Sequence, residues 1–253
     1  MNAPNHIAIK ATAVCCQDAR LLSAFGLDSV MPDKTLLPAG LRRRSGLTTL
    51  MAVTAAMHAC QRAAAKTDQL VSVFASVGGE IKVTDVLCRS LTTPDYLLSP
   101  TQFHNSVHNT TAGYWSILTQ CQQPATAIAA IEDTFAMALL EAWSQLQQQP
   151  GDLLLVCYDE LWPQYLAPPM GSNALACAMV LTSDISTNHQ GLISRPEIRP
   201  EAIKLRQDLI ELTQSAPAAA CIPLLQALNQ GHHDGCVSLN TQGINWSVQL
   251  NQP

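Results

Sequence analysis

The hydrophobic positions of the chain follow two repeating patterns, which predict strands and helices in turn. Strand-length apolar runs lie at residues 6–14, 70–76, 125–131, 152–160, 173–183 and 235–250. Residues 133–148 instead place apolar side chains at every third or fourth position, as a helix with one buried face does. Strands that are apolar throughout are buried on both faces, so the chain is predicted to be an α/β protein whose mixed sheet is covered by helices on both sides.

Other signals mark where these elements begin and end. A second long helix is predicted to start from a cap at Ser45, and its buried stripe comprises Leu47, Leu50, Met51, Thr54 and His58. Gly78 and Gly79 predict a tight turn after a strand, and 82–91 reads as a short helix. The prolines and charges of 183–212 predict a loop, which makes this segment the best candidate for a boundary.

The composition limits the classes of function. Of the 253 residues, 13% are charged and 47% hydrophobic, so a partner is expected to cover part of the surface. The net charge of −5, with only Arg42, Arg43 and Arg44 as a basic cluster, argues against a nucleic-acid partner.

The chain shows no membrane span or secretion signal. Because no apolar run reaches about 18 residues, and the first ten residues lack a signal-peptide pattern, we expect a cytoplasmic protein. Its nine cysteines are therefore expected to be reduced, and Cys60, Cys121, Cys157 and Cys177 read as small buried hydrophobic residues.

Two histidine-containing segments could be read as metal sites. His104 and His108 have helical spacing, but Asn105 stands where a zinc hydrolase needs glutamate. The segment 231–236, GHHDGC, lacks a second ligand pair and its glycines predict a turn between strands. We therefore expect neither a metal nor a cofactor.

Residues 158–160, Tyr-Asp-Glu, follow a strand, where both catalysis and an exposed acidic loop are reasonable interpretations.

A glutamate occupies a corner where enzymes often place a nucleophile. The apolar run 125–131 turns directly into the helix 133–148, and Glu132 stands between them. Around this corner, several short motifs follow one another in a definite order: LRRRSGLTTLMAVTAA, FASVGGE, Ser99-Pro100, Asn109, Ala112-Gly113, Ile117, Pro124 and LLLVCYDE.

The order and separation of these motifs resemble the β-ketoacyl synthases of the thiolase-like superfamily. The resemblance covers residues 7–182 and implies a thiolase-like fold with a shortened second half. It divides the chain into a ketosynthase-like half, 1–182, and a reduced C-terminal portion, 183–253, packed on it as one compact unit.

The resemblance also implies that the catalytic groups are missing. An active ketosynthase has cysteine at this corner, where the helix N-terminus lowers the thiol pKa and the thiolate accepts the acyl chain. Here Glu132 falls on that position, and Cys121 precedes Pro124 and cannot occupy it. At the family's usual separations, the two histidines that decarboxylate malonyl units would lie beyond Pro253.

A ketosynthase-like chain without a nucleophile is similar to the chain length factors of type II polyketide systems. Those proteins typically have glutamine at the corner, so glutamate is a departure. The short length and the segments SVHNTTAGYWS and EDTFAMALLEAW also resemble compact subunits linked to aryl polyene pigments. The resemblance implies a heterodimer or larger assembly with an active ketosynthase, which an acyl carrier protein contacts through the complex.

Two other classes of function stay open. Glu132 could serve a malonyl decarboxylase or an acyltransferase, although a carboxylate is also accepted at a helix start simply because the amides there favour an anion. A thiolase-like homodimer that binds a small molecule is the third interpretation.

The resemblance assigns further residues to a pocket and an interface. Val77 falls on the wall of the acyl pocket, with Ile81 and Thr84 on the same face, although ordinary core packing explains these positions equally well. The strand before the corner pairs across the dimer axis in the family, and unpaired it would be an exposed apolar edge. The expected interface comprises Gln102, Phe103, Ala125, Thr126, Ala127, Ile128, Ala129, Ala130 and Ile131.

Overall fold

A single mixed sheet organises the protein in the computed structural model, which describes residues 6–92, 97–163, 165, 174–231 and 234–251. Its strands are β1 (His6–Cys16), β2 (Val71–Ala75), β3 (Ala125–Ile128), β4 (Asp152–Asp159), β5 (Leu175–Thr182), β6 (Gly191–Ser194), β7 (Glu197–Ile198), β8 (Asp234–Ser238) and β9 (Trp246–Asn251). They are arranged in the order β3-β2-β4-β5-β1-β6-β9-β7, with β8 also paired to β9. The sheet thus joins the first and last parts of the chain.

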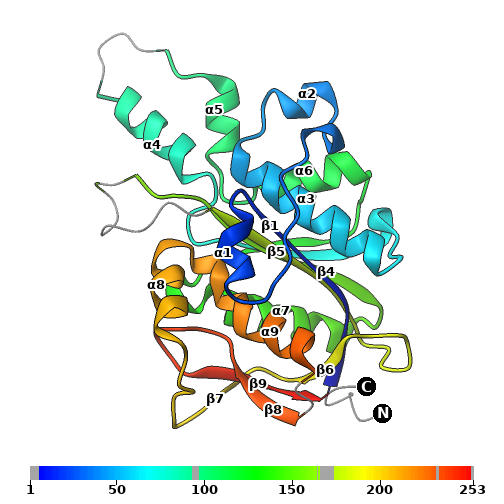
Figure 1. Ribbon diagram of the computed structural model, residues 1–253. Coiled ribbons are helices and arrows are strands. Elements are labelled where there is room, and N and C mark those ends of the chain that lie inside the picture. Colours follow the sequence, from blue (N-terminus) through cyan, green and yellow to red (C-terminus); the bar gives the residue numbers. More distant parts are fainter. Residues whose placement is uncertain (1–5, 93–96, 164, 166–173, 232–233, 252–253) are drawn as a thin grey trace.

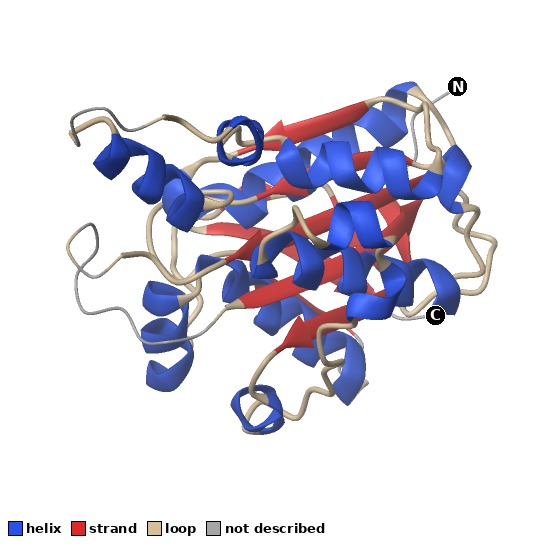
Figure 2. Cartoon of the chain, turned by 90° about the horizontal axis from the view of Figure 1, so that it is seen from above, coloured by secondary structure: helices blue, strands red, loops and turns tan. Residues whose placement is uncertain are grey.

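Helices cover both faces of the sheet (Figures 1 and 2). The α-helices are α1 (Ala19–Ser23), α2 (Ala39–Arg42), α3 (Leu47–Arg62), α4 (Ile81–Ser90), α5 (Pro100–Asn105), α6 (Thr110–Thr119), α7 (Thr134–Gln148), α8 (Gln207–Ser215) and α9 (Ile222–Gln230). Short 3₁₀ helices are η1 (Lys34–Leu36), η2 (Thr67–Gln69), η3 (Ile131–Asp133) and η4 (Pro217–Cys221).

The side chains of β4 show why this sequence needs two layers of helices. Leu153, Leu155 and Cys157 pack with α7, η4 and α9, whereas the alternate residues Leu154 and Val156 pack with α3 and α6. Because successive side chains of a strand point to opposite faces, an uninterrupted apolar strand must be buried on both. This confirms the predicted α/β sheet covered on both sides.

The strand β3 lies at one end of the sheet. It pairs in parallel with β2, in the register Ser72↔Ala125 to Ala75↔Ile128, and β2 pairs in parallel with β4. No strand in the described part of the chain pairs with the other edge of β3, and its residues are half-buried or exposed. From the sequence, an unpaired edge strand was expected over residues 125–131. The observed strand is shorter, because it ends at Ile128 and residues 129–131 lie outside it.

Two sequence-based expectations about the elements were wrong. The first residue of α3 follows Gly46, while the hydroxyl of Ser45 donates to the carbonyl of Leu41. The segment 183–212 is a loop only in part, because β6, β7 and the start of α8 interrupt its irregular stretches. These short elements are stabilised by pairing with β1 and β9, which are distant in sequence, so local patterning does not reveal them.

Within the described residues, no helix combines the length and the apolar character needed to cross a bilayer. All nine cysteines are free thiols. Burial raises the pKa of Cys15 and Cys60 to about 12, so these thiols behave as small hydrophobic groups, as the sequence predicted.

Candidate functional site

Two loops lie side by side where the parallel strands β2 and β3 end. The 76–80 loop follows β2, and residues 129–133, which we call the elbow, follow β3. Ala75 pairs with Ile128, and the amide of Ser76 donates to the carbonyl of Ile128 at 3.1 Å. The ends of parallel strands are common places for ligand and substrate contacts in α/β proteins, so this edge is the candidate site.

The elbow contains an unusual backbone conformation. Ile131 has a φ of +49°, a region that β-branched residues rarely enter. The hydroxyl of Thr134 fixes the turn, since it accepts from the amide of Ala130 at 2.9 Å and donates to the carbonyl of Ile131 at 2.7 Å. The 3₁₀ helix η3 then leads into α7. The chain therefore makes a sharp corner, as its sequence predicted, and the structure adds that the backbone at this corner is strained.

Glu132 occupies this corner without a chemical partner. Its side chain is exposed, and within the described residues it makes no hydrogen bond or ion pair. It lies two positions before α7 begins. A carboxylate nucleophile or base requires an acid, a cation or a donor that holds it, and the described surroundings of Glu132 supply none.

The next residue, Asp133, is held by the C-terminal portion of the chain. The Nδ2 atom of Asn240 donates to its Oδ1 at 2.7 Å. Gly243 approaches so closely that an added Cβ would lie 2.9 Å from the same oxygen, and its φ of +83° also favours glycine. The loop between β8 and β9 therefore packs directly against the elbow, a contact that sequence reasoning missed because the two segments are about a hundred residues apart.

Asp159, the last residue of β4, is a buried acid beside the 76–80 loop. Its Oδ1 accepts from the hydroxyl of Ser76 at 2.9 Å and from the amide of Val77 at 2.8 Å. Burial raises the pKa of Asp159 to about 7, although these donors and the amides of Gly78 and Ala218 oppose the shift. The interpretation of 158–160 as an exposed loop was therefore wrong.

Two buried glutamates, Glu80 and Glu160, accept hydrogen bonds at the starts of neighbouring helices. The Oε1 atom of Glu80 accepts from the amide of Thr49 at 3.1 Å and from its hydroxyl at 2.6 Å, in the first turn of α3. Glu160 accepts from the amide of Lys82 at 2.9 Å, at the start of α4, and burial raises its pKa. Helix starts favour anions, so these buried acids fix where α3 and α4 begin.

The raised pKa of Asp159 predicts a pH-dependent stability. Between about pH 4 and 7, the folded protein retains a proton that the unfolded chain has released. The free energy of unfolding should therefore fall as the pH rises through this window, by up to about 4 kcal/mol, and level off above it. Glu160 acts in the same direction.

Urea denaturation at pH 5 and pH 8 measures this dependence. The decrease in the free energy of unfolding from pH 5 to pH 8 should be smaller in Asp159→Asn than in the wild type, because the variant cannot ionise at this position. An equal decrease in the two proteins would contradict the assignment of the pH dependence to Asp159.

The predicted pocket residues lie in or beside the 76–80 loop. Val77 is half-buried in the loop, and Ile81 and Thr84 are half-buried in α4. The hydroxyl of Thr84 is directed toward the carbonyls of Glu80 and Ser106 at 3.4 and 3.5 Å. The structure thus places all three near one another, on the side of the loop where α4 and α5 project.

His104 and His108 make separate contacts and do not meet in a metal site. His104 lies in α5 and packs against the ring of Tyr114, whereas His108 lies between α5 and α6 with Nε2 2.8 Å from the carbonyl of Ser76. No group of three potential metal ligands occurs among the described residues. His232 and His233 are outside the described residues.

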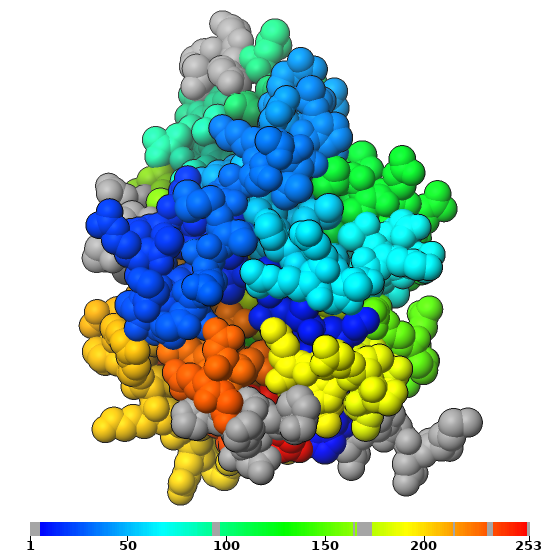
Figure 3. Space-filling model, turned by 45° about the vertical axis from the view of Figure 1, so that its right-hand side comes forward, coloured from blue at the N-terminus to red at the C-terminus, as the bar shows by residue number. Residues whose placement is uncertain are grey.

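Exposed apolar side chains gather around α4 and α5, which form a narrow projection at one end of the molecule (Figures 1 and 3). Phe103 is 63% exposed, while its neighbour Gln102 is half-buried. The other exposed members are Val86, Leu91, Leu97, Leu98 and Val107. Exposed apolar side chains concentrated on one projection are typical of a protein interface.

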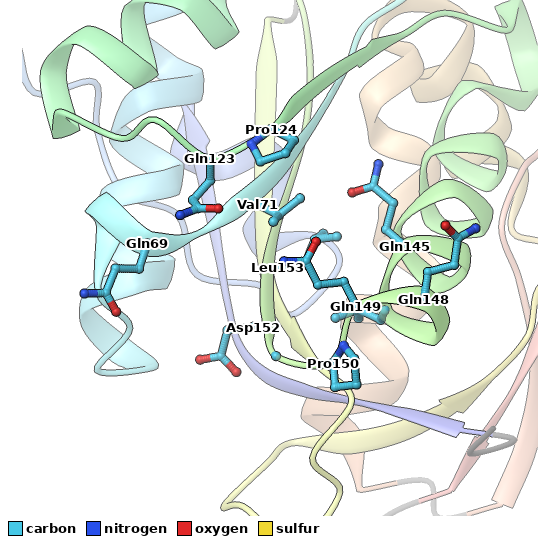
Figure 4. Close-up of a pocket in the computed structure, with 12 residues that line it drawn as sticks. Gln69, Val71, Gln123, Pro124, Gln145, Gln148, Gln149, Pro150, Asp152 and Leu153 are labelled. Carbon is cyan, nitrogen blue, oxygen red and sulfur yellow. The ribbon is translucent and has the colours of Figure 1, made fainter. Parts of the chain in front are cut away.

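A cavity of about 490 Å³ lies at the opposite ends of β2, β3 and β4 (Figure 4). Its lining is mostly neutral and comprises Gln69, Val71, Gln123, Pro124, Gln145, Leu146, Gln148, Gln149, Pro150, Gly151, Asp152 and Leu153. Because it adjoins the first residues of these strands, it is separate from the elbow.

Comparisons with known proteins identify the class of fold. A family model described as "Beta-ketoacyl synthase, N-terminal domain" matches residues 20–247. The chain therefore belongs to the β-ketoacyl synthase family, which confirms the resemblance read from the sequence. Among curated proteins, no relative matches.

Solved structures show the same fold at low sequence identity. A chain of the ketosynthase ApeO in complex with its chain length factor ApeC, from Xenorhabdus doucetiae, is similar with a TM-score of 0.72 at 16% identity, covering 98% of this chain and 100% of that one. The ishigamide ketosynthase/chain length factor gives 0.71 at 12%, covering 98% and 99%. A β-ketoacyl synthase from Burkholderia phymatum STM815 gives 0.61 at 12%, covering 87% and 71%.

Proposed function

We propose that this protein is a non-condensing chain length factor that pairs with an active ketosynthase and shapes the pocket for the growing acyl or polyene chain. The observation that carries the proposal is the elbow: its sharp corner presents Glu132, which is exposed and has no partner among the described residues, instead of a thiol. Two of the similar structures are complexes of a ketosynthase with a chain length factor. A third combines AntDE with its acyl carrier protein AntF.

The free surfaces support an interface with a second ketosynthase-like chain. The outer edge of β3 has no partner strand among the described residues, and residues 125–131 at this edge are half-buried or exposed. Phe103 and the other exposed apolar residues of the α4–α5 projection would also be buried by a partner. An interface that includes both would be large and apolar, as obligate interfaces are.

The chemistry would then be divided between the two subunits. The partner supplies the cysteine and histidines of the condensation and receives substrate from an acyl carrier protein. This subunit supplies half of the interface and, through Val77, Ile81 and Thr84, part of the wall beside the chain. Residues 1–182 and 183–253 act as one unit in this proposal, supported by the pairing of β6 with β1.

Co-expression with the active ketosynthase of the same host tests the proposal. We expect a hetero-complex that condenses malonyl units from acyl carrier protein, and a subunit that by itself forms no acyl adduct. Recovery of a homodimer with no hetero-complex would instead favour a thiolase-like protein outside polyketide synthesis. The free thiols of all nine cysteines are consistent with the cytoplasm as the place of this reaction.

Replacing Glu132 by alanine separates the proposed function from an enzyme that uses this residue. Because the side chain is exposed and has no partner in the part of the chain that the structure describes, Glu132→Ala should change the condensation rate of the complex by less than about threefold. Malonyl decarboxylation and product formation are measured at matched complex concentration. A loss of orders of magnitude, with assembly intact, would instead assign decarboxylase or acyltransferase chemistry to Glu132.

A further inference from the structure

Several hydrogen bonds hold the 76–80 loop, and two of them lead to one carboxylate oxygen of Asp159. The amide of Ser76 donates to the carbonyl of Ile128 at 3.1 Å, and the amide of Val77 to Oδ1 of Asp159 at 2.8 Å. The hydroxyl of Ser76 accepts from the amide of Gly79 at 2.8 Å and donates to the same Asp159 oxygen at 2.9 Å. Removing Asp159 would leave two donors, the hydroxyl of Ser76 and the amide of Val77, without this acceptor.

Packing restricts the loop as well. An added Cβ at Gly78 would lie 3.0 Å from the ring of Trp162, and Gly79, with a φ of +57°, lies against His108. Nε2 of His108 in turn is 2.8 Å from the carbonyl of Ser76. The loop therefore has contacts on both sides, and among the described residues Asp159 is the acidic side chain that accepts from a backbone amide of the loop, that of Val77.

The carboxyl of Asp159 also lies beside the C-terminal portion of the chain. The amides of Gly78 and of Ala218, in the buried helix η4, both lower its pKa, although burial outweighs them. Its Oδ1 atom accepts both bonds from the loop, whereas Oδ2 is buried without a hydrogen-bond partner among the described residues. A fully buried acid is costly to maintain, so an apolar residue would be the simpler choice if packing were its whole role.

We propose that Asp159 is a positioning residue, which fixes Val77 relative to the elbow and thereby sets how far the growing chain can extend. This inference rests on the proposed function, in which Val77 is part of the pocket wall. A wall limits chain length only if it does not yield, because packed interiors discriminate by steric exclusion. Asp159 supplies that rigidity through backbone bonds, whatever side chain residue 77 has.

The test uses the complex with the active ketosynthase and acetyl- and malonyl-loaded acyl carrier protein. In Asp159→Asn, the amide oxygen is a weaker acceptor than the carboxylate oxygen, and the amide nitrogen takes the place of Oδ2, which is buried without a hydrogen-bond partner among the described residues. The substitution should therefore loosen the loop, so that amide exchange at Val77 becomes at least about tenfold faster and the products shift toward longer chains. Val77→Trp, which narrows the same wall, should shorten them. Product length is measured by mass spectrometry, and amide exchange by hydrogen–deuterium exchange of the same complexes.

Asp152→Asn is the matched control. Asp152 is the same residue type at the other end of β4, where it pairs with Lys10 at 2.7 Å, far from the loop. It should leave both the exchange of Val77 and the product length unchanged. A length shift in Asp152→Asn equal to that in Asp159→Asn would contradict the proposal, because general loosening of β4 would then explain both.

The outcomes separate the inference from the function on which it rests. If Val77→Trp shortens the product while Asp159→Asn leaves it unchanged, Asp159 does not position the wall, although the wall assignment holds. If neither changes the length, the wall assignment itself fails. Should Asp159→Asn not fold, Ser76→Ala removes the hydroxyl between Asp159 and Gly79, and it should lengthen the products too. An unchanged length in Ser76→Ala would then overturn the proposal.

Discussion

Replacing Ala127 by proline should abolish the complex with the ketosynthase while the subunit itself stays folded. The carbonyls of Pro124 and Ile128 accept from Ser72 and Ser76 of the β2 segment. In a parallel pair, alternate residues bond to the same neighbour, so the amide of Ala127 points to the free edge of β3. Proline removes that donor but leaves the pairing with β2 intact.

The experiment compares Ala127→Pro with Ala127→Ser, which keeps the amide. We expect the proline variant to bind the ketosynthase at least about a hundredfold more weakly, a loss of nearly 3 kcal/mol, whereas the serine variant binds normally. Circular dichroism and thermal melting check the fold of each subunit. Normal co-purification of Ala127→Pro with the ketosynthase would show that the edge of β3 is not the interface.

Replacing Gly46 by alanine should destabilise the protein strongly, although the position looks permissive. The backbone at Gly46 has a φ of −75°, which alanine adopts readily. An added Cβ, however, would lie 2.0 Å from Oε2 of Glu80. The substitution must displace this buried carboxylate from Thr49 and from the start of α3, which we expect to cost about 2–5 kcal/mol.

Gly40 provides the matched control. It lies in α2, and an added Cβ there meets no atom within 4 Å. Gly40→Ala should therefore leave the free energy of unfolding unchanged or raise it by about 0.5 kcal/mol. Urea denaturation of the two variants at one pH measures the difference. If Gly46→Ala is as stable as Gly40→Ala, the capping role of Glu80 is wrong.

The buried acids show where sequence reasoning succeeds and where it fails. Asp159 and Glu160 attracted attention in the sequence because they come at the end of an apolar strand. Catalysis and an exposed acidic loop were the two interpretations, and neither predicted that these acids are buried. Their burial depends on α4, η4 and the 76–80 loop, which come together only in three dimensions. The hydrophobic run before these acids, together with the glycine-rich loop after the neighbouring parallel strand, was the sequence signal that could have indicated their burial.

By itself, the sequence determined the α/β sheet covered on both faces, the sharp turn before 133–148, and the glutamate at that corner, because hydrophobic periodicity and single residues are local properties. Only the tertiary structure decided where the edge strand ends, which acids are buried, and which distant residues meet the elbow. Those features depend on the pairing of segments far apart in the chain, such as β6 with β1 and Asn240 with Asp133. No local pattern encodes such pairings, since each arises from the packing of the whole fold.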